Sequence, residues 1–358
     1  MTNNNEFNKV LMNDLKEKQS WSLDRKVAYS KEKIVEFVEY MGGIENTYVS
    51  FSGGKDSCVL LHLVRSIYPN AGGVFFNTGL EYPEILSHVK TFENIEWRKP
   101  RKTPTQVWRE YGVPVVSKEY SRYISDVREG GSVTQTQKRL NFRNSYSLPK
   151  KWIHFTDTEF FEPKVSNKCC DYFKKLPSKD YEKETGKYAF VGTMAEESQL
   201  RMSSWVKHSC NIYAEEGSNT RPQSRPLSIW TEKDIWEYIE RYDVSICELY
   251  HKGLKRTGCF CCPYGAHLED RQEGTNRFEL LKESHPKHYK ALDKMGIREA
   301  LLNMRVPIRN DETYMIQLGR KEESIKEWYE RTQKNIEENG ENSPYWQYHK
   351  YFEPKTKK

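Results

Sequence analysis

The sequence lacks any apolar run long enough to cross a bilayer, and its first ten residues, MTNNNEFNKV, hold no hydrophobic signal region. The mean hydropathy of −0.88 and the 30% share of charged residues are typical of a soluble chain. Charge of one sign is not in large excess, since the net charge is +6. We therefore predict a cytoplasmic protein with no membrane partner, whose modest positive charge suits an anionic partner without requiring a nucleic acid.

Cysteine is sparse, with eight residues in 358, and in a cytosolic chain this number does not indicate a disulfide framework. The cysteines are clustered, however. Cys169 and Cys170 are adjacent, and the segment TGCFCCPYG brings three more within four positions. The members of this second cluster are Cys259, Cys261 and Cys262.

A Walker phosphate loop is also absent, but a different glycine loop is present. The segment SFSGGKDS, residues 50–57, joins a predicted strand over 47–51 to a predicted helix over 55–67. Its two glycines let the backbone approach an anion closely, and the new helix directs unpaired N–H groups at the same point. We predict that this loop binds phosphate; an ordinary glycine turn is the alternative. The expected binding residues are Ser50, Ser52, Gly53, Gly54, Lys55, Asp56 and Ser57.

Strand and helix patterns alternate after this loop, which predicts an α/β fold: a parallel twisted sheet with helices on both faces. Short strands are expected in GGVFFNTG, residues 72–79, and at 95–98 and 187–193, and helices are expected at 24–41, 105–111 and 195–202. Residues 113–168 are polar and are expected to form an irregular or helical insertion. Ligands sit at the carboxyl ends of strands in such sheets. A second loop, Asn77, Thr78 and Gly79, follows a strand and should lie beside the first.

The C-terminal part has helical patterns and no internal repeat. Thr231 is expected to cap a helix over 231–241, with Asp234 at its third position. Further helices are expected at 268–283, 286–303 and 322–338. We predict a helical lead-in over 1–45, a nucleotide-binding domain with the clustered cysteines over 46–265, and a helical extension over 266–358.

These motifs, in this order, resemble the phosphoadenosine phosphosulfate (PAPS) reductase-like family of PP-loop adenine nucleotide alpha hydrolases, which have a HUP or Rossmann-like fold. SFSGGKDS is similar to the PP-loop S-G-G-x-D-S, FFNTGLEYPE to D-T-G-x-x-x-P-E, and GTMAEESQLR to G-x-R-x-x-E-S-x-x-R. Asn77 stands where the family usually has Asp, and Met194 where Arg is common. The resemblance implies catalytic roles for Lys55, Lys174 and Arg201.

The cysteine clusters resemble the split CC...C-x-x-C pattern that holds a 4Fe-4S cluster in adenylyl-sulfate reductases and their relatives. The resemblance implies that the metal ligands are Cys169, Cys170, Cys259 and Cys262. Whether Cys261 replaces Cys259 or Cys262 as a ligand stays open. A zinc site with four cysteine ligands satisfies the same spacing rules.

Reductases of this family carry a nucleophilic cysteine near the C-terminus, in E-C-G-[IL]-H, and no cysteine follows Cys262 in this sequence. The expected function is therefore ATP binding with cleavage between the α and β phosphates, in sulfur transfer or nucleic-acid modification. This resembles the cluster-bearing component of DNA phosphorothioation systems and its phage or prophage relatives. Mg²⁺ is the expected metal on the phosphates, with Asp56 as the nearest carboxylate. Two alternatives are a sulfonucleotide reductase with an external thiol and a non-catalytic regulator that binds a nucleotide and a cluster.

The remaining expectations concern partners: an adenine nucleotide, a nucleic-acid or protein acceptor, a sulfur-donor protein and a second copy of the chain. A stretch of basic and aromatic residues is the candidate nucleic-acid surface, with an ordinary solvated surface as the alternative. Its members are Lys138, Arg139, Phe142, Arg143, Tyr146, Lys150, Lys151 and Trp152, and the basic residues of the segment RKPRK, residues 98–102, belong to the same candidate surface.

Overall fold

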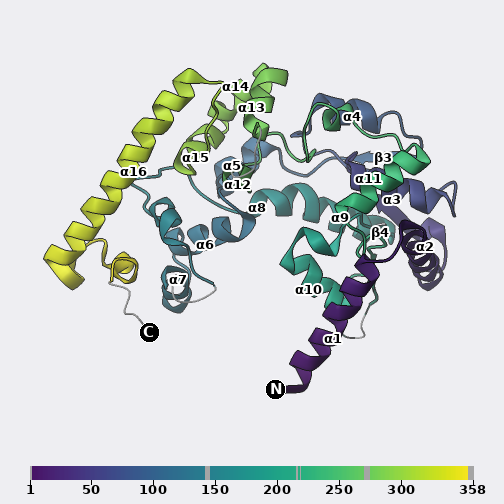
Figure 1. Ribbon diagram of the computed structural model, residues 1–358. Helices are drawn as coiled ribbons and strands as arrows, with labels where there is room; N and C mark the ends of the chain where they lie inside the picture. The colour runs from purple at the N-terminus through teal and green to yellow at the C-terminus, as the bar shows by residue number, and fades with distance from the viewer. Residues whose placement is uncertain (1, 142–145, 215–216, 218, 270–274, 354–358) are drawn as a thin grey trace. The chain divides into compact units, whose positions relative to one another are not determined.

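The structure is a computed structural model that describes residues 2–141, 146–214, 217, 219–269 and 275–353 (Figure 1). Its contacts divide the chain into two compact units. The first unit is formed by Met1–Arg101 and Lys174–Gly258, and the second by Lys102–Phe173 and Cys259–Lys358. This grouping differs from the predicted division at residues 45 and 265, because the segment over 102–173 joins the C-terminal part.

The first unit contains a six-stranded sheet, counted over the described residues, with the strand order β3-β2-β1-β4-β6-β5. The strands are β1 Thr47–Ser50, β2 Gly73–Phe76, β3 Ile95–Arg98, β4 Tyr188–Phe190, β5 Asn211–Ile212 and β6 Gln223–Ser224. Four neighbouring pairs are parallel, and only β5 runs antiparallel, against β6. The predicted α/β fold with a mostly parallel sheet is confirmed.

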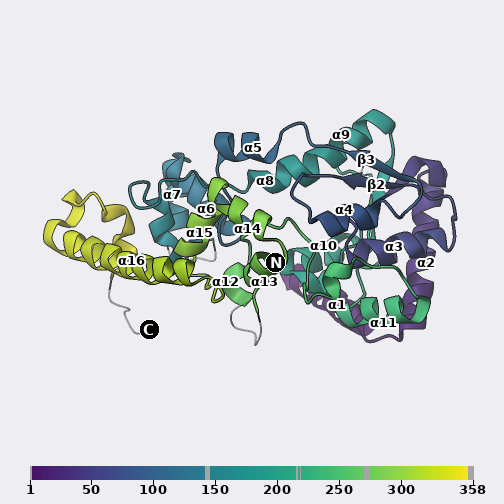
Figure 2. The ribbon, with the colours of Figure 1, turned by 90° about the horizontal axis from the view of Figure 1, so that it is seen from above.

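Seven helices, among the described residues, complete the first unit. They are α1 Thr2–Gln19, α2 Leu23–Tyr40, α3 Lys55–Arg65, α4 Pro83–Val89, α9 Leu176–Thr185, α10 Gln199–His208 and α11 Glu232–Tyr242. Three short 3₁₀ segments join them: η1 Ile44–Asn46, η4 Ala195–Glu197 and η5 Glu248–Tyr250. In both ribbon views α1 lies beside α10, and the two helices are in contact (Figures 1 and 2).

Helices cover both faces of the sheet because successive strand residues point to opposite sides. On one face Tyr181 of α9 packs edge-on against Tyr48 of β1, with ring centroids 4.9 Å apart, and also contacts Ala189 of β4. On the other face Phe37 of α2 packs against Phe190 of β4, with centroids 5.2 Å apart. Figure 2 shows α9 on the opposite side of β2 and β3 from α3 and α4.

The second unit is helical in its described residues. Its helices are α5 Pro104–Tyr111, α6 Lys118–Arg128, α7 Val133–Leu140, α8 Lys168–Cys170, α12 Ala266–Glu269, α13 Arg277–Ser284, α14 Pro286–Lys294, α15 Ile297–Asn303 and α16 Glu312–Asn339. Its 3₁₀ segments are η2 Lys150–Thr156, η6 Gly340–Asn342 and η7 Trp346–Tyr351, and the π-helical turn η3, Asp171–Lys175, leads back to the first unit. The buried Trp328 anchors α16, since its indole N–H donates to Asp157 Oδ2 at 2.7 Å.

Several predicted helices are interrupted at residues with a non-helical backbone. The helix expected over 195–202 is split, because Ser198 is extended and instead caps α10 through its side chain. The helix expected over 286–303 is divided by Gly296, which has a positive φ of 69°. Between α12 and α13, residues 270–274 lie outside the described part. Among the described residues, none of the helices is both long and apolar enough to cross a membrane.

Candidate functional site

Three loops of the first unit begin at the same edge of the sheet. They follow the carboxyl ends of β1, β2 and β4, which are neighbouring parallel strands. The first is the SFSGGKDS loop, the second begins at Asn77, and the third begins after Phe190. Because parallel strands end on one side of a sheet, the first two loops lie at one edge, as expected, and the third loop, which was not predicted there, joins them.

The glycine loop needs both of its glycines. Gly53 has a φ of +72°, and a Cβ there would lie 2.7 Å from Cγ2 of the buried Val89. A Cβ on Gly54 would lie 3.0 Å from Thr257 Oγ1. The third loop also approaches closely, since a Cβ on Gly192 would lie 3.0 Å from the carbonyl oxygen of Asp56. The loop is therefore enclosed by backbone and side chains of its own unit.

The hydroxyl groups of the loop form a local network. Ser57 Oγ donates to the Gly54 carbonyl at 2.8 Å, accepts from the Ser52 N–H at 3.2 Å, and lies 3.1 Å from Ser52 Oγ. Ser50 ends β1 and is half-buried. These bonds hold Ser52 and Ser57 against the start of α3, where the first-turn N–H groups lack intrahelical partners.

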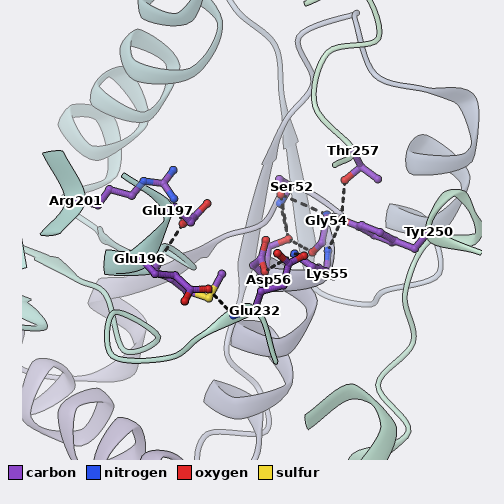
Figure 3. A network of polar contacts seen from close by, with 12 residues as sticks. Ser52, Gly54, Lys55, Asp56, Glu196, Glu197, Arg201, Glu232, Tyr250 and Thr257 are labelled. Carbon is purple, nitrogen blue, oxygen red and sulfur yellow. Dashed lines mark hydrogen bonds and ion pairs between the residues drawn. The ribbon is translucent and has the colours of Figure 1, made fainter. Parts of the chain in front are cut away.

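Lys55 begins α3 and is only 5% exposed, which is unusual for a charged side chain. Its Nζ donates to Asp56 Oδ1 at 3.0 Å and lies 3.7 Å from Glu232 Oε1 at the start of α11. The ring of Trp236, also on α11, is centred 6.0 Å from Nζ. Figure 3 shows Lys55, Asp56 and Glu232 grouped at this point. A buried ammonium that pairs with carboxylates can exchange one of these partners for another anion.

Tyr250 is a site residue that the sequence did not reveal. Its hydroxyl accepts the backbone N–H of Lys55 at 2.9 Å and lies 3.0 Å from Thr257 Oγ1 (Figure 3). Burial raises the pKa of Tyr250 to about 12, so the hydroxyl stays protonated at neutral pH. The only sequence signal for this contact was the position of Thr257 two residues before Cys259.

The second loop is held by its own side chains. The Asn77 amide oxygen accepts the N–H of Gly79 at 2.9 Å, and the buried Thr78 donates its hydroxyl to Glu81 Oε1 at 2.6 Å. Gly79 has a φ of +78° with nothing close to a Cβ position. Asn77 performs this turn-forming role as an amide, without the charge of the aspartate that is usual in the motif.

The third loop connects the remaining acidic and basic residues. Glu197 forms an ion pair with Arg201 and accepts the N–H of Met194 at 2.8 Å, while Glu196 accepts the N–H of Glu232 at 2.6 Å. Both glutamates therefore position other groups (Figure 3). Burial lowers the pKa of Arg201, and a second guanidinium, that of Arg256, lowers it further. The guanidinium groups of Arg201 and Arg256 therefore lie close enough for their charges to interact.

The positions of Lys174 and of the basic and aromatic stretch do not test their predicted roles. Lys174 is exposed in η3, so its catalytic role stays a prediction. In the basic and aromatic stretch, Lys138 lies 4.4 Å from the ring centre of the exposed Tyr146, but Phe142 and Arg143 lie outside the described residues. Contact with a nucleic acid likewise stays a prediction.

The four predicted metal ligands all lie in the second unit. Cys169 and Cys170 end α8, and the Cys262 N–H donates to the Cys259 carbonyl at 3.0 Å in a tight turn. A hydrogen bond with Cys170 and burial raise the pKa of Cys169, with further contributions from Cys170, Cys262 and Cys259. Cys170, Cys259 and Cys262 therefore lie close enough to Cys169 to influence its thiol.

The burial of the second cysteine segment differs from residue to residue. Cys261 is 2% exposed, and Cys259 and Cys262 are half-buried. Burial also raises the pKa of Tyr264, and Cys169 and Cys170 raise it further, which places this ring beside the same thiols. Among the residues that the structure describes, no three His, Cys, Asp or Glu side chains are arranged as ligands of one metal ion. The thiols converge on one region, and their use as ligands stays a prediction.

The sheet, the glycine loop after β1 and the buried lysine at the start of α3 define an α/β protein with a strand–glycine loop–helix site at the carboxyl edge of its sheet. Residues 46–123 and 131–264 match the sequence model of the phosphoadenosine phosphosulfate reductase domain family. The chain belongs to this family. The match includes all three loops and both cysteine segments.

Curated relatives include proteins with different named activities. An adenosine 5'-phosphosulfate reductase of Anoxybacillus flavithermus is 25% identical, over 61% of this chain and 73% of its own length. Subunit 2 of a sulfate adenylyltransferase from Rhizobium etli is 26% identical, over 71% and 75% respectively. An uncharacterised protein of Methanocaldococcus jannaschii is 28% identical over 62% of this chain. The chain spans only 39% of that archaeal protein's length.

Proposed function

We propose that the chain binds ATP at the SFSGGKDS loop and transfers its adenylyl group to an acceptor with release of pyrophosphate. The observation that carries this proposal is the buried Lys55 at the start of α3, beside a glycine loop at the edge where three loops meet. Charge and N–H groups converge there, as phosphate binding requires. The reaction would serve sulfur transfer or the modification of a nucleic acid or protein acceptor.

Each group has a role that follows from its position. The Lys55 ammonium would neutralise charge on the β and γ phosphates, the first-turn N–H groups of α3 other than that of Lys55 would donate hydrogen bonds to them, and Ser52 and Ser57 would donate further hydrogen bonds. Arg201 would stabilise charge on the α phosphate, helped by Lys174. Asp56, the nearest carboxylate, would help to hold Mg²⁺, which would neutralise charge on the phosphates.

The proposed step is a displacement at the α phosphorus. A nucleophile on the acceptor forms a bond to this atom, the bond to the bridging oxygen breaks, and pyrophosphate leaves with that electron pair. The acceptor is then adenylated and has lost one proton to solvent. Catalysis rests on alignment and on a charged cradle, and needs no covalent bond to the protein.

Cys169, Cys170, Cys259 and Cys262 are the proposed ligands of a 4Fe-4S cluster, because they belong to one unit and the other three lie within electrostatic reach of Cys169. A bound cluster would supply electron-transfer chemistry. Zinc is the alternative metal for the same donor set. A sulfur-donor protein and a second copy of the chain are the further proposed partners.

A sulfonucleotide reductase is the second candidate, favoured by the relative named as an adenosine 5'-phosphosulfate reductase. That chemistry needs an accessible thiolate. The cysteines outside the two clusters are all buried, which raises the pKa of Cys210 to about 11 and also raises the pKa of Cys58 and Cys247. Burial therefore opposes their use as nucleophiles, and this candidate would require an external thiol.

Product analysis distinguishes the candidates. Without the acceptor, we expect ATP with Mg²⁺ to be hydrolysed slowly to AMP and pyrophosphate. With the acceptor, pyrophosphate should form faster, and AMP should follow when sulfur or another nucleophile displaces it from the adenylated acceptor. We expect no sulfite from adenylyl sulfate or its 3'-phosphorylated form in the presence of thioredoxin. Sulfite production that Cys210→Ser or Cys247→Ser abolishes would overturn the proposal. Nucleotide binding with neither product, even with candidate acceptors, would favour the non-catalytic regulator.

A further inference from the structure

The first turns of α11 present an acidic and an aromatic side chain to the ammonium group of the glycine loop. Glu232 and Trp236 are four residues apart, so they lie on the same face of the helix. Glu232 Oε1 is 3.7 Å from Lys55 Nζ, and the Trp236 ring centre is 6.0 Å from it. The Trp236 ring also contacts Tyr250, with centroids 5.8 Å apart, so this face of α11 is fixed against the loop from two sides.

The backbone holds Glu232 in this place. Its N–H donates to Glu196 Oε1 of the third loop at 2.6 Å, and Thr231 caps the helix through hydrogen bonds with Asp234. The Glu232 side chain is nevertheless 59% exposed, whereas the Lys55 side chain is 7% exposed. An exposed partner of an ion pair is weakly held and can be displaced.

The charged groups at ion-pair distance from Lys55 disfavour the binding of an anion. One ammonium faces two carboxylates, those of Asp56 and Glu232, so the three side chains together carry a net charge of −1. A polyphosphate that reaches Lys55 must approach both carboxylates, and like charges at ion-pair distance repel. A divalent cation that accompanies the phosphates would cancel this repulsion.

We infer that Glu232 is the displaceable counter-ion of Lys55 and that it makes nucleotide binding depend on a divalent cation. Without Mg²⁺, the carboxylate competes with phosphate for the ammonium. With Mg²⁺, the phosphates arrive with their charge largely neutralised and Glu232 is moved aside. This inference rests on the proposed nucleotide site. It assigns to α11 the discrimination between Mg²⁺–ATP and metal-free ATP.

The test is calorimetric titration of the full chain with ATP, once with Mg²⁺ and once with a chelator. Glu232→Gln should tighten the binding of metal-free ATP by about three- to tenfold, the scale of one screened unit-charge interaction. It should change the binding of Mg²⁺–ATP by less than about twofold, so the gap between the two affinities narrows. Added salt should shrink the difference between variant and wild type, which a purely structural role would not do.

Glu237→Gln is the matched control, because Glu237 lies on the same helix and pairs with Arg241. It should behave as the wild type in both titrations. Equal metal-free affinities for the wild type and Glu232→Gln would overturn the inference and leave the proposed function intact. A large loss of Mg²⁺–ATP binding in Glu232→Gln would also overturn it, since Glu232 would then be a metal ligand. Absence of ATP binding in all three proteins would overturn the proposed function as well.

Discussion

Replacing Lys55 by methionine tests the glycine loop directly, since methionine keeps the unbranched apolar stem and removes the ammonium. Lys55 is 5% exposed and its Nζ lies 3.0 Å from Asp56 Oδ1, so a phosphate that binds there gains a short, charged hydrogen bond. Hydrogen bonds to charged groups contribute about 1.5 to 3 kcal/mol. We therefore expect Lys55→Met to weaken Mg²⁺–ATP binding by roughly ten- to 150-fold.

The folding cost of this change should be small. The side chains of Asp56 and Glu232 are 27% and 59% exposed, so both carboxylates regain water when the ammonium is lost. Partly exposed ion pairs contribute about 1 kcal/mol or less. Thermal unfolding of the variant without nucleotide should therefore stay close to that of the wild type, which separates a binding defect from a folding defect.

Lys252→Met provides the control, because Lys252 is an exposed lysine of the same unit that pairs with Glu84 and Glu248. It should leave ATP affinity unchanged when both variants are measured by calorimetry. Unchanged affinity in a folded Lys55→Met protein would refute the reasoning, for it would show that the buried ammonium does not face the phosphates.

The remaining predictions concern the cysteines and the loop glycines. Anaerobically purified protein should be brown, with about four irons and four sulfides per chain. Cys169→Ser should bleach it and Cys210→Ser should not, whereas stoichiometric zinc without sulfide would contradict the cluster. Gly53→Ala should destabilise the fold by about 2 to 4 kcal/mol, because the new Cβ would meet Val89 Cγ2 at 2.7 Å at a residue with positive φ. Gly79 also has a positive φ, but the space around its Cβ position is open. Denaturant unfolding should therefore show that Gly79→Ala lowers the free energy of unfolding by only about 1 kcal/mol. Equal losses of unfolding free energy in the two variants would contradict the steric argument.

Local features of the fold were predictable from the sequence. The strand over 95–98 was placed correctly, and Thr231 caps α11 with Asp234 at the third position, as expected. Both depend on residues a few positions apart, which a sequence pattern displays directly. The split at Ser198 was not predicted, because the acidic and apolar residues on its two sides still follow a helical pattern.

The contacts that complete the site could not be predicted in the same way. The Tyr250 hydroxyl accepts the N–H of Lys55, which lies 195 positions earlier in the chain. Glu232, which also contacts Lys55, belongs to the other chain segment of the first unit. Such pairs are fixed by how helices pack on the sheet, and no periodicity in a single sequence encodes them. The first two loops could be predicted to lie together only because parallel strands share an edge, and the position of the third loop was not predicted.

The position of β1 has a consequence for synthesis on the ribosome. This strand lies between β2 and β4, and Thr47 pairs with Tyr188, so its second neighbour is translated about 140 residues later. At a translation rate of about 5 to 20 residues per second, the edge of β1 that pairs with β4 stays unpaired for roughly 7 to 28 s. During that interval the nascent chain exposes the unpaired edge of β1, and an unpaired strand edge can template aggregation. Expression yield should therefore depend on chaperones that shield nascent chains, and slower translation should increase that dependence.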